Sequence, residues 1–288
     1  MDGIFFIDKP IGISSRNICN QIGKKFHTKK VGHLGTLDPF ASGLLIVAIN
    51  KATKALTFLD ESIKEYVATI KLGVETDSLD NTGKVIKEIK PKKYSEEDIN
   101  NVLKKFKGPI KQIPPMTSAI HVNGKRLYEL AHQGIEIDRK ARDIIVYENK
   151  LISYDKENDE ITIYFKVSSG TYIRTLGSDI AKELGSIGHL NKLERTGVVV
   201  FSIKECSSLE DVLNDKVSSK KVKDVLLKVM DVTSFNENKI NDIKNGKIRY
   251  LEVESKNNRI LVVDSSDNEI AVYTKNKEGK FEFTRGLF

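Results

Sequence analysis

Residues 43–50 read GLLIVAIN, an apolar run with no alternating polar position. A short run that is apolar throughout is typical of a strand buried on both faces, so the chain is expected to fold around a covered sheet. Directly before it, residues 32–43 read GHLGTLDPFASG, with three glycines and a single carboxylate, Asp38. This composition predicts a loop that presents Asp38 beside the buried strand, with Pro39 fixing the direction of the chain. A turn aspartate that caps its own backbone has the same signature.

Strands and helices follow one another without the regular succession of βαβ units, which indicates an α+β fold. Strands are expected at 3–8, 43–50, 64–73, 84–90, 142–154, 160–170 and 197–203. Helices are expected at 14–26, 51–59, 95–108, 171–185 and 208–214, with a further short helix ending at Gly134. Ser95 and Asp98 have the spacing of a capping box. The strands at 64–73 and 84–90 flank a polar turn and are expected to form a hairpin.

The charge of the chain is unevenly distributed. The formal net charge is +7, whereas residues 229–288 hold ten basic and ten acidic residues, so the excess lies in residues 1–228. A basic surface favours nucleic acid or an anionic membrane, although a lysine-rich protein without such a partner has the same composition. The run DKVSSKKVKD at 215–224 is a candidate linker, and the turns and short strands beyond it predict a small β module.

The cysteines and the N-terminus bear on the compartment. Cys19 and Cys206 offer neither a disulfide framework nor a metal-binding spacing, so a reducing cytoplasm is expected. The N-terminus, MDGIFFIDKP, lacks the basic and long apolar regions of a signal peptide. The longest apolar run, LLIVAI, is far shorter than a bilayer requires, so no membrane association is expected.

The polar motifs exclude several chemistries. The glycine-rich stretch matches neither a Walker loop nor a dinucleotide-binding loop, which excludes a nucleotide cofactor held in those ways. Asp77 and Asp80 resemble part of a calcium loop but lack its remaining ligands, so a solvated turn is expected there. The histidines form no metal-binding pair. Arg174 stands in the first turn of an expected helix, either on the surface or aimed at a carboxylate. The stretch at 64–73 alternates like a half-buried strand with Tyr66, Ala68, Ile70 and Leu72 on one face, so Tyr66 fits a strand aromatic that faces the core.

Five segments in chain order resemble the TruB family of pseudouridine synthases. They are IDKPIGISS, GHLGTLDPFASGLL, KEYVATIKLGVETDSLDNTG, SSGTYIRTLGSDIAKELG and HLNKLERTGVVVF. The match extends over residues 3–213. The resemblance implies a pseudouridine synthase catalytic domain at 1–228, with a mixed, largely antiparallel central sheet and flanking helices. It also implies an RNA-clamping insertion at 116–147 and a small PUA-like β domain at 229–288.

The resemblance also assigns roles to individual residues. It makes Asp38 the catalytic aspartate, Arg174 the arginine that pairs with it, and Tyr66 the tyrosine beside the target base. His33 is similar to the histidine that enters the T-loop of tRNA, and Leu193 to a leucine that lines the base pocket. Lys9 matches the lysine of a packed Lys-Pro pair in the family. The residues that the resemblance further implies in binding RNA are Lys9, Gly32, Thr36, Lys125, Arg126 and Arg142.

The implied reaction converts uridine 55 in the T-loop of tRNA to pseudouridine after the base has left its stack. Because this isomerisation has no redox step and no group donor, neither a cofactor nor a metal is expected. The chain is expected to act on the T-arm as a monomer without guide RNA. A guide-RNA-directed synthase and an RNA chaperone with secondary catalysis are the alternatives. The sequence leaves open which atom Asp38 attacks or deprotonates.

Overall fold

The computed structural model describes residues 2–59, 62–118, 121–122, 125–127, 133–135 and 137–288. The chain forms two compact units. The first contains Met1–Leu37, Leu44–Asp60 and Val200–Phe288, and the second contains Asp38–Gly43 and Glu61–Val199. The predicted domain boundary at residues 228 and 229 falls within the first unit and stays a prediction.

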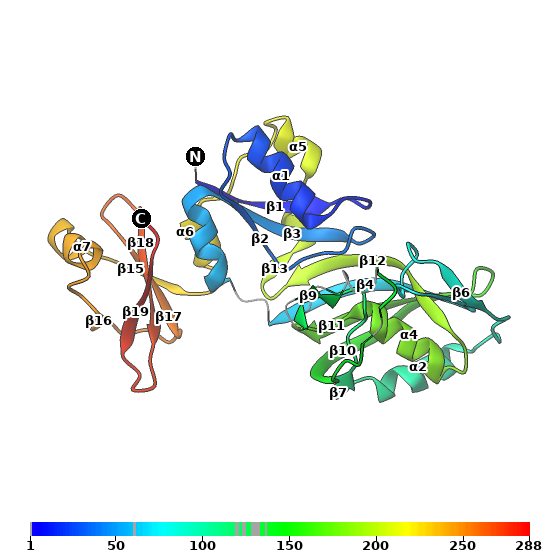
Figure 1. Ribbon diagram of the computed structural model, residues 1–288. Coiled ribbons are helices and arrows are strands. Elements are labelled where there is room, and N and C mark those ends of the chain that lie inside the picture. The colour runs from blue at the N-terminus through cyan, green and yellow to red at the C-terminus, as the bar shows by residue number, and fades with distance from the viewer. Residues whose placement is uncertain (1, 60–61, 119–120, 123–124, 128–132, 136) are drawn as a thin grey trace. The chain divides into compact units, whose positions relative to one another are not determined.

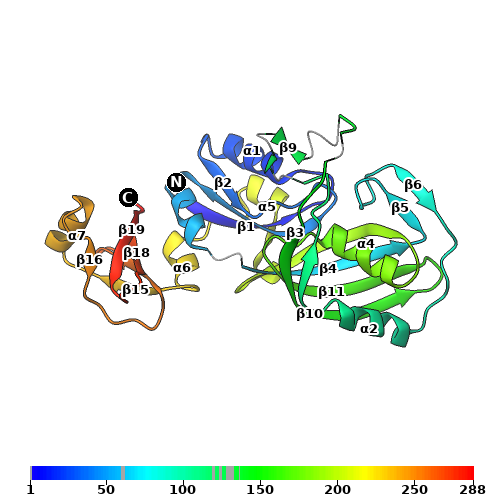
Figure 2. The ribbon, with the colours of Figure 1, turned by 60° about the horizontal axis from the view of Figure 1, so that its bottom comes forward.

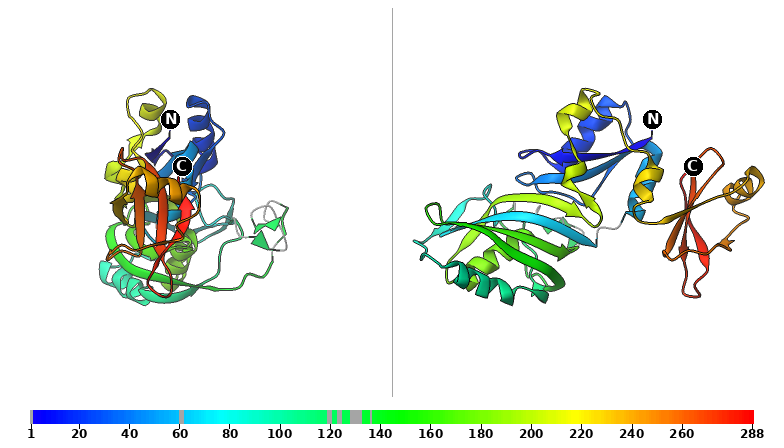
Figure 3. Two further views of the ribbon diagram at one scale, coloured as in Figure 1. Left: turned by 90° about the vertical axis from the view of Figure 1, so that its left-hand side faces the viewer. Right: turned by 180° about the vertical axis from the view of Figure 1, so that it is seen from behind.

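The second unit is built on an antiparallel sheet with the strand order β12-β4-β11-β10-β7. These strands are β4 (Ile63–Leu72), β7 (Gly108–Gln112), β10 (Arg142–Asp155), β11 (Glu160–Ser168) and β12 (Gly188–Val198). Two ribbons accompany the sheet, namely β5 (Val74–Thr76) with β6 (Val85–Glu88), and β8 (His121–Val122) with β9 (Lys125–Arg126). The left panel of Figure 3 shows the ribbon of β8 and β9 standing away from the sheet.

Every second side chain of β4 from Tyr66 onward is apolar or aromatic, which gives this sheet a buried face. Tyr66, Ala68, Ile70 and Leu72 are all buried, as the sequence predicts, and they share one side of the strand because side chains alternate along it. β4 lies between β12 and β11 and is therefore hydrogen-bonded along both edges.

Two helices cover one face of the sheet. α2 (Glu96–Lys105) and α4 (Ile173–Glu183) lie side by side on it (Figures 1 and 2). A Cβ added at Gly177 of α4 would lie 2.8 Å from Leu190 of β12 and 3.3 Å from Ile70 of β4. The helix therefore packs closely against the face that carries Ile70.

Asp179 of α4 offers a test of this packing. Burial raises the pKa of its carboxyl above the ordinary value, and Lys182 offsets part of the effect. A carboxyl whose pKa is higher in the folded chain stabilises the fold when protonated, and this contribution is lost as the pH rises through the folded pKa. We therefore expect Asp179→Asn to melt at a higher temperature than the unmodified chain at pH 7, with a smaller difference near pH 4.

Melting curves of both proteins between pH 4 and pH 8 check this expectation. Glu183→Gln, in the same helix, is the matched control because Glu183 pairs with Lys105 across 2.5 Å and is not expected to gain stability. An Asp179→Asn variant that melts below the unmodified chain at every pH contradicts the expectation.

The first unit contains the apolar run from which the fold was predicted. β1 (Gly3–Lys9) lies between β14 (Ser207–Ser208) and β3 (Ser42–Ile49), and β2 (Val31–Leu34) pairs with β3. The other elements here are α1 (Ser15–Lys25), η1 (Asn50–Phe58), β13 (Phe201–Ser202), η2 (Ile203–Glu205), α5 (Leu209–Leu213) and α6 (Val222–Leu226). Residues 44–49 of β3 are at most 1% exposed, which confirms a strand buried on both faces.

The C-terminal part of the first unit has a sheet of its own, in the order β15-β17-β18-β19-β16. Its elements are β15 (Asp231–Ser234), α7 (Glu237–Lys244), β16 (Tyr250–Leu251), β17 (Arg259–Val263), β18 (Glu269–Lys275) and β19 (Phe281–Gly286). α7 lies beside this sheet (Figures 1 and 3). Ile240 and Ile243 of α7 pack with Tyr273 and Phe281 of the sheet. The predicted small C-terminal β module is confirmed.

The α+β class and the largely antiparallel sheet are confirmed, as is the capping box of Ser95 and Asp98. Two strand predictions are wrong. Residues 188–196 form most of β12, although no strand was expected before residue 197, because charged residues interrupt its apolar pattern. β6 pairs with β5 and not with β4, since the chain turns again after residue 73. No helix in the described ranges is long and apolar enough to cross a membrane.

The predicted linker at 215–224 is also wrong, because much of it is bound to the fold. Lys220 and Ile4 exchange two backbone hydrogen bonds, of 3.0 and 2.8 Å. α6 then begins at Val222, whose side chain is buried. The segment therefore continues the packing of the first unit.

Candidate active site

Asp38 begins a tight turn in the second unit. The backbone N–H of Ala41 donates to the carbonyl oxygen of Asp38 across 3.1 Å, and Pro39 takes the second position of the turn. The fixed φ of proline suits that position. The side chain of Asp38 is 39% exposed, so the carboxylate is accessible while its backbone is held. The structure confirms a turn that presents Asp38.

A buried arginine orients this carboxylate. Nε of Arg174 lies 3.0 Å from Oδ2 of Asp38, and the side chain of Arg174 is only 5% exposed. Arg174 is in the first turn of α4, as predicted, and the alternative of a surface arginine is wrong. A guanidinium beside a carboxylate favours the ionised form and fixes its direction.

Asp80 lies beside the same guanidinium and was missed as a site residue. Its Oδ2 lies 3.4 Å from Nη1 of Arg174. Its Oδ1 accepts hydrogen bonds from Oγ of Ser78 at 2.7 Å and from the backbone N–H of Thr82 at 3.0 Å. The expected solvated turn is wrong, because Asp80 is 4% exposed. Hydroxyl residues two positions to either side of a carboxylate were the available signal of a buried, hydrogen-bonded group.

Further bonds hold the other two nitrogens of the guanidinium. Nη1 of Arg174 donates to the carbonyl oxygen of Ser78 at 2.9 Å, and Nη2 donates to that of Thr117 at 2.9 Å.

The buried side chain of Gln112 accepts from the backbone N–H of Tyr172 at 2.8 Å and donates to its carbonyl oxygen at 3.0 Å. Because Tyr172 is the N-cap of α4, Gln112 fixes where the helix that carries Arg174 begins.

Tyr66 and Leu193 come from neighbouring central strands. In the register of β4 with β12, Tyr66 is opposite Arg195 and Leu193 is opposite Ala68. Residues directly opposite one another point to the same face of a sheet. Tyr66 and Leu193 therefore lie on the face that α4 covers, and each is 7% exposed. The sheet thus brings both residues to the side from which Arg174 reaches Asp38.

The end of the Asp38 turn is fixed to this sheet. Gly43 pairs with Arg195, which pairs in turn with Tyr66. With neighbouring strands about 4.8 Å apart, the backbones at Gly43 and Tyr66 are separated by about 10 Å. Gly43 has a φ of +104°, and a Cβ there would lie 2.4 Å from the carbonyl oxygen of Arg195. Another backbone therefore approaches this position so closely that only glycine fits.

Substitution of Gly43 is expected to disturb both the fold and the site. Gly43→Ala forces a Cβ against the Arg195 backbone and is expected to lower the free energy of unfolding by about 3 kcal/mol. Displacement of the turn by about 1 Å is expected to reduce activity by about 100-fold. Denaturant unfolding and turnover measurements check the two effects.

Gly279→Ala is the matched control, because Gly279 also has a positive φ, of +79°, but a Cβ there would meet nothing within 4 Å. It is expected to lose about 1 kcal/mol of stability and no activity. Equal effects of the two substitutions contradict the account given for Gly43.

Three residues with predicted RNA contacts lie in the first unit near β2. Gly32 and His33 are on β2 itself, so the prediction that they belong to a loop is wrong. Gly32 needs no left-handed conformation, unlike Gly35, whose φ is +65°. Thr36 is exposed. Their contacts with RNA stay predictions.

Lys9, also in the first unit, is enclosed by the protein. It has no exposed surface, and its Nζ donates to the carbonyl oxygens of Pro10 at 2.9 Å and Ile13 at 2.6 Å. These bonds hold the segment between β1 and α1, a role in packing. A part for Lys9 in binding RNA stays a prediction.

The predicted insertion at 116–147 is described in part. Lys125 and Arg126 form β9, which pairs with β8, and Arg142 is an exposed residue at the start of β10. The short helix expected before Gly134 lies outside the described residues. The roles of these basic residues in clamping RNA stay predictions.

In the described ranges, no three side chains of His, Cys, Asp or Glu gather as metal ligands do. The two carboxylates of the site, Asp38 and Asp80, are bridged by the guanidinium of Arg174. A cation is therefore already placed between them by the chain itself.

The chain is similar to several known proteins. The family model described as TruB family pseudouridylate synthase (N terminal domain) matches residues 23–173. A protein named tRNA pseudouridine synthase B from Mycoplasma capricolum is 37% identical over 285 residues, which cover 99% of this chain and 96% of that protein. Proteins of the same name from Hydrogenovibrio crunogenus and Bacillus pumilus are 41% and 36% identical, over 85% and 96% of this chain and 80% and 93% of theirs.

Solved structures share the fold at lower identity. The Cbf5 chain in the crystal structure of a Cbf5-Nop10-Gar1 complex superimposes with a TM-score of 0.72 at 22% identity, covering 99% of this chain and 85% of that one. A chain in the archaeal box H/ACA sRNP Nop10-Cbf5 complex gives a TM-score of 0.69 at 20% identity, covering 99% and 86%.

Proposed function

Because the chain belongs to the TruB family of pseudouridine synthases, we propose that it converts uridine 55 in the T-loop of tRNA to pseudouridine. The observation that carries the proposal is the 3.0 Å pair of Arg174 and Asp38, which joins a half-exposed carboxylate to a buried guanidinium. Relatives that cover nearly the whole chain are named for tRNA, which supports this substrate.

The reaction needs one reactive carboxylate. The C1′–N1 bond of the uridine breaks, the base turns, and a C1′–C5 bond forms, after which C5 loses its proton and N1 takes one up. Asp38 acts as nucleophile or base at C6, at C1′ or at the proton on C2′, and in each case it must be ionised. The base covers the carboxylate with apolar surface, and the guanidinium of Arg174 opposes the resulting preference for the neutral form.

Arg174 is in turn held by Asp80. Asp38, Arg174 and Asp80 together carry a net charge of −1, so two carboxylates compensate the guanidinium, while the side chain of Asp38 stays 39% exposed. Asp80 is a positioning residue in this proposal, because its other oxygen is engaged by Ser78 and Thr82. The proposed roles of the two carboxylates therefore differ, Asp38 being the reactive one and Asp80 a structural one.

Tyr66 and Leu193 are proposed to flank the flipped base. Both lie on the sheet face beneath α4, and both retain a small exposed surface of 7%. An aromatic ring can stack on an unpaired base, and a leucine offers an apolar wall. His33 is proposed to fill the stack that the uridine leaves.

Tritium release from a tRNA transcript labelled at C5 of uridine tests the proposed function. Release by the chain alone, abolished in a transcript with cytidine in place of uridine 55, is the expected result. Release that persists from the cytidine transcript overturns the assignment of position 55. Absence of release despite tRNA binding overturns the enzyme and favours an RNA chaperone.

The chain is further proposed to act as a cytoplasmic monomer on the T-arm without guide RNA or cofactor. The alternative, guidance by a second RNA, is suggested only by a fold shared with Cbf5 at 22% identity. The tritium-release assay distinguishes the stand-alone enzyme from the guided one. Only a stand-alone enzyme releases tritium when the purified chain and a single transcript are the only components.

A further inference from the structure

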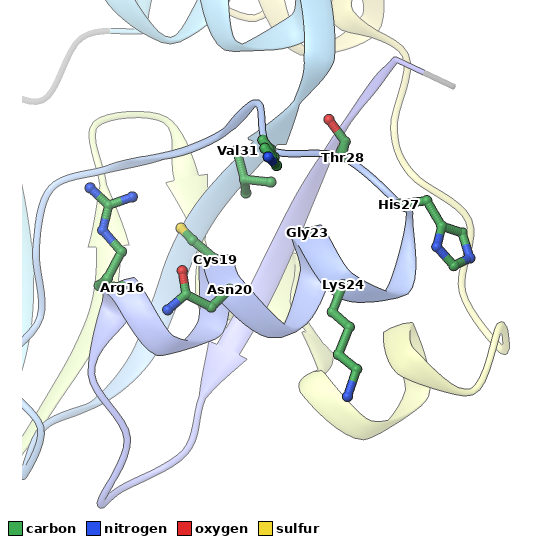
Figure 4. Close-up of a pocket in the computed structure, with 9 residues that line it drawn as sticks. Arg16, Cys19, Asn20, Gly23, Lys24, His27, Thr28 and Val31 are labelled. Carbon is green, nitrogen blue, oxygen red and sulfur yellow. The ribbon is translucent and has the colours of Figure 1, made fainter.

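A pocket of 630 Å³ lies on the first unit, formed by one side of α1 and by the segment that leads from α1 into β2 (Figure 4). Arg16 and Lys24 contribute from the helix, and His27 and Lys29 from the segment that follows. None of the residues that line it belongs to the Asp38 site. We call it the α1 pocket.

All the charged side chains that line the α1 pocket are basic. Arg16, Lys24 and Lys29 are exposed, and no acidic residue lines the pocket. No acid of the described residues forms an ion pair with any of the three. Lys25, which does not line the pocket, contrasts with them because it pairs with Asp215 across 2.5 Å. The uncompensated cations of the pocket therefore come from α1 and from the segment that follows it.

The spacing of these charges suits a linear polyanion. Arg16 and Lys24 are eight residues apart on one helix, which separates their backbones by about 12 Å. Such a span meets more than one phosphate of a nucleic-acid strand, whereas a single small anion would occupy only part of it. A row of basic residues without base-reading geometry binds backbone rather than sequence.

The pocket also continues toward a residue with a predicted RNA contact. Val31 lines the pocket and is the first residue of β2, and His33 lies two positions further along this strand. At about 3.3 Å per residue, the two positions are roughly 7 Å apart. A strand of RNA that reaches His33 can therefore continue directly into the α1 pocket.

We propose that the α1 pocket binds the phosphate backbone of tRNA adjacent to the target loop, through Arg16, Lys24 and Lys29. The inference rests on the proposed function for the identity of the RNA and adds a second contact surface to it. Asp38 and its partners then act on the base, while the pocket supplies affinity that does not depend on sequence.

Binding of tRNA at several salt concentrations tests this inference. Replacement of Arg16, Lys24 and Lys29 by alanine together is expected to raise the Kd for tRNA by roughly 10- to 100-fold and to reduce the slope of log K against log salt by about 2. The kcat at saturating tRNA is expected to stay unchanged. A charge-preserving variant, Arg16→Lys with Lys24→Arg and Lys29→Arg, is expected to retain the native affinity and slope.

The matched control removes three exposed lysines of the second unit, Lys87, Lys90 and Lys92, and so lowers the net charge equally. Equal affinities and slopes for the two triple variants overturn the inference, because only net charge would then matter. Melting curves establish that each variant is folded.

Filter binding measures affinity without turnover, so the test is independent of catalysis. A chain that binds tRNA but releases no tritium overturns the proposed function and leaves the test of the pocket in force. A chain that releases tritium but keeps its affinity after loss of the three charges overturns the pocket alone.

Discussion

Asp38→Asn is expected to lower kcat for tritium release by about 10⁴-fold or more, because an amide is neither a nucleophile nor a base. Asparagine keeps the shape of the side chain, and its carbonyl oxygen can still accept from Nε of Arg174, which lies 3.0 Å from Oδ2 of Asp38. Affinity for tRNA is therefore expected to stay close to that of the unmodified chain. Single-turnover kinetics and filter binding measure the two quantities.

Asp143→Asn makes the same chemical change elsewhere in the second unit. Asp143 is 83% exposed and forms a surface pair with Lys111, so the variant is expected to retain full activity. Tritium release by Asp38→Asn at a rate near that of Asp143→Asn contradicts the role given to Asp38.

Arg174→Lys is expected to reduce kcat by about 10² to 10³-fold while the positive charge is kept. The guanidinium bonds to Asp38, Asp80, Ser78 and Thr117 through three nitrogens, and an ammonium cannot reach all of these acceptors from one position. Loss of some bonds is also expected to lower the free energy of unfolding by about 2 kcal/mol. Turnover at a temperature well below the melting transition separates the two effects.

Arg285→Lys is the control for this substitution, since Arg285 is exposed in the C-terminal sheet and its replacement is expected to change nothing. If Arg174→Lys turns over tRNA at the native rate, positive charge alone is sufficient and the orientation of the guanidinium does not matter.

Local features of this fold were predicted well from the sequence. Ser95 and Asp98 form the capping box of α2, and Pro39 directs the turn at Asp38, because each depends on residues within a few positions. The buried face of β4 was likewise predicted, since alternation along one strand is a property of adjacent residues.

Features that depend on distant partners were predicted less well. β12 was missed because Lys192 and Glu194 break its apolar pattern, and pairing with β4 stabilises it nonetheless. Asp80 was assigned to a solvated turn because nothing adjacent to it in the sequence predicts the buried guanidinium of Arg174. The pairing of Asp38 with Arg174 came from the family resemblance, since the residues alone also allowed a surface arginine.

β4 carries Tyr66 and is bonded to β11 on one edge and β12 on the other. The backbone beneath the proposed position of the base therefore cannot shift without breaking strand pairs on both edges. Because this part of the sheet is rigid, the RNA has to change its conformation to bring the base to it. The protein would then act on loops whose bases unstack easily and not on paired helices. The deformability of the RNA thus becomes part of how the substrate is recognised.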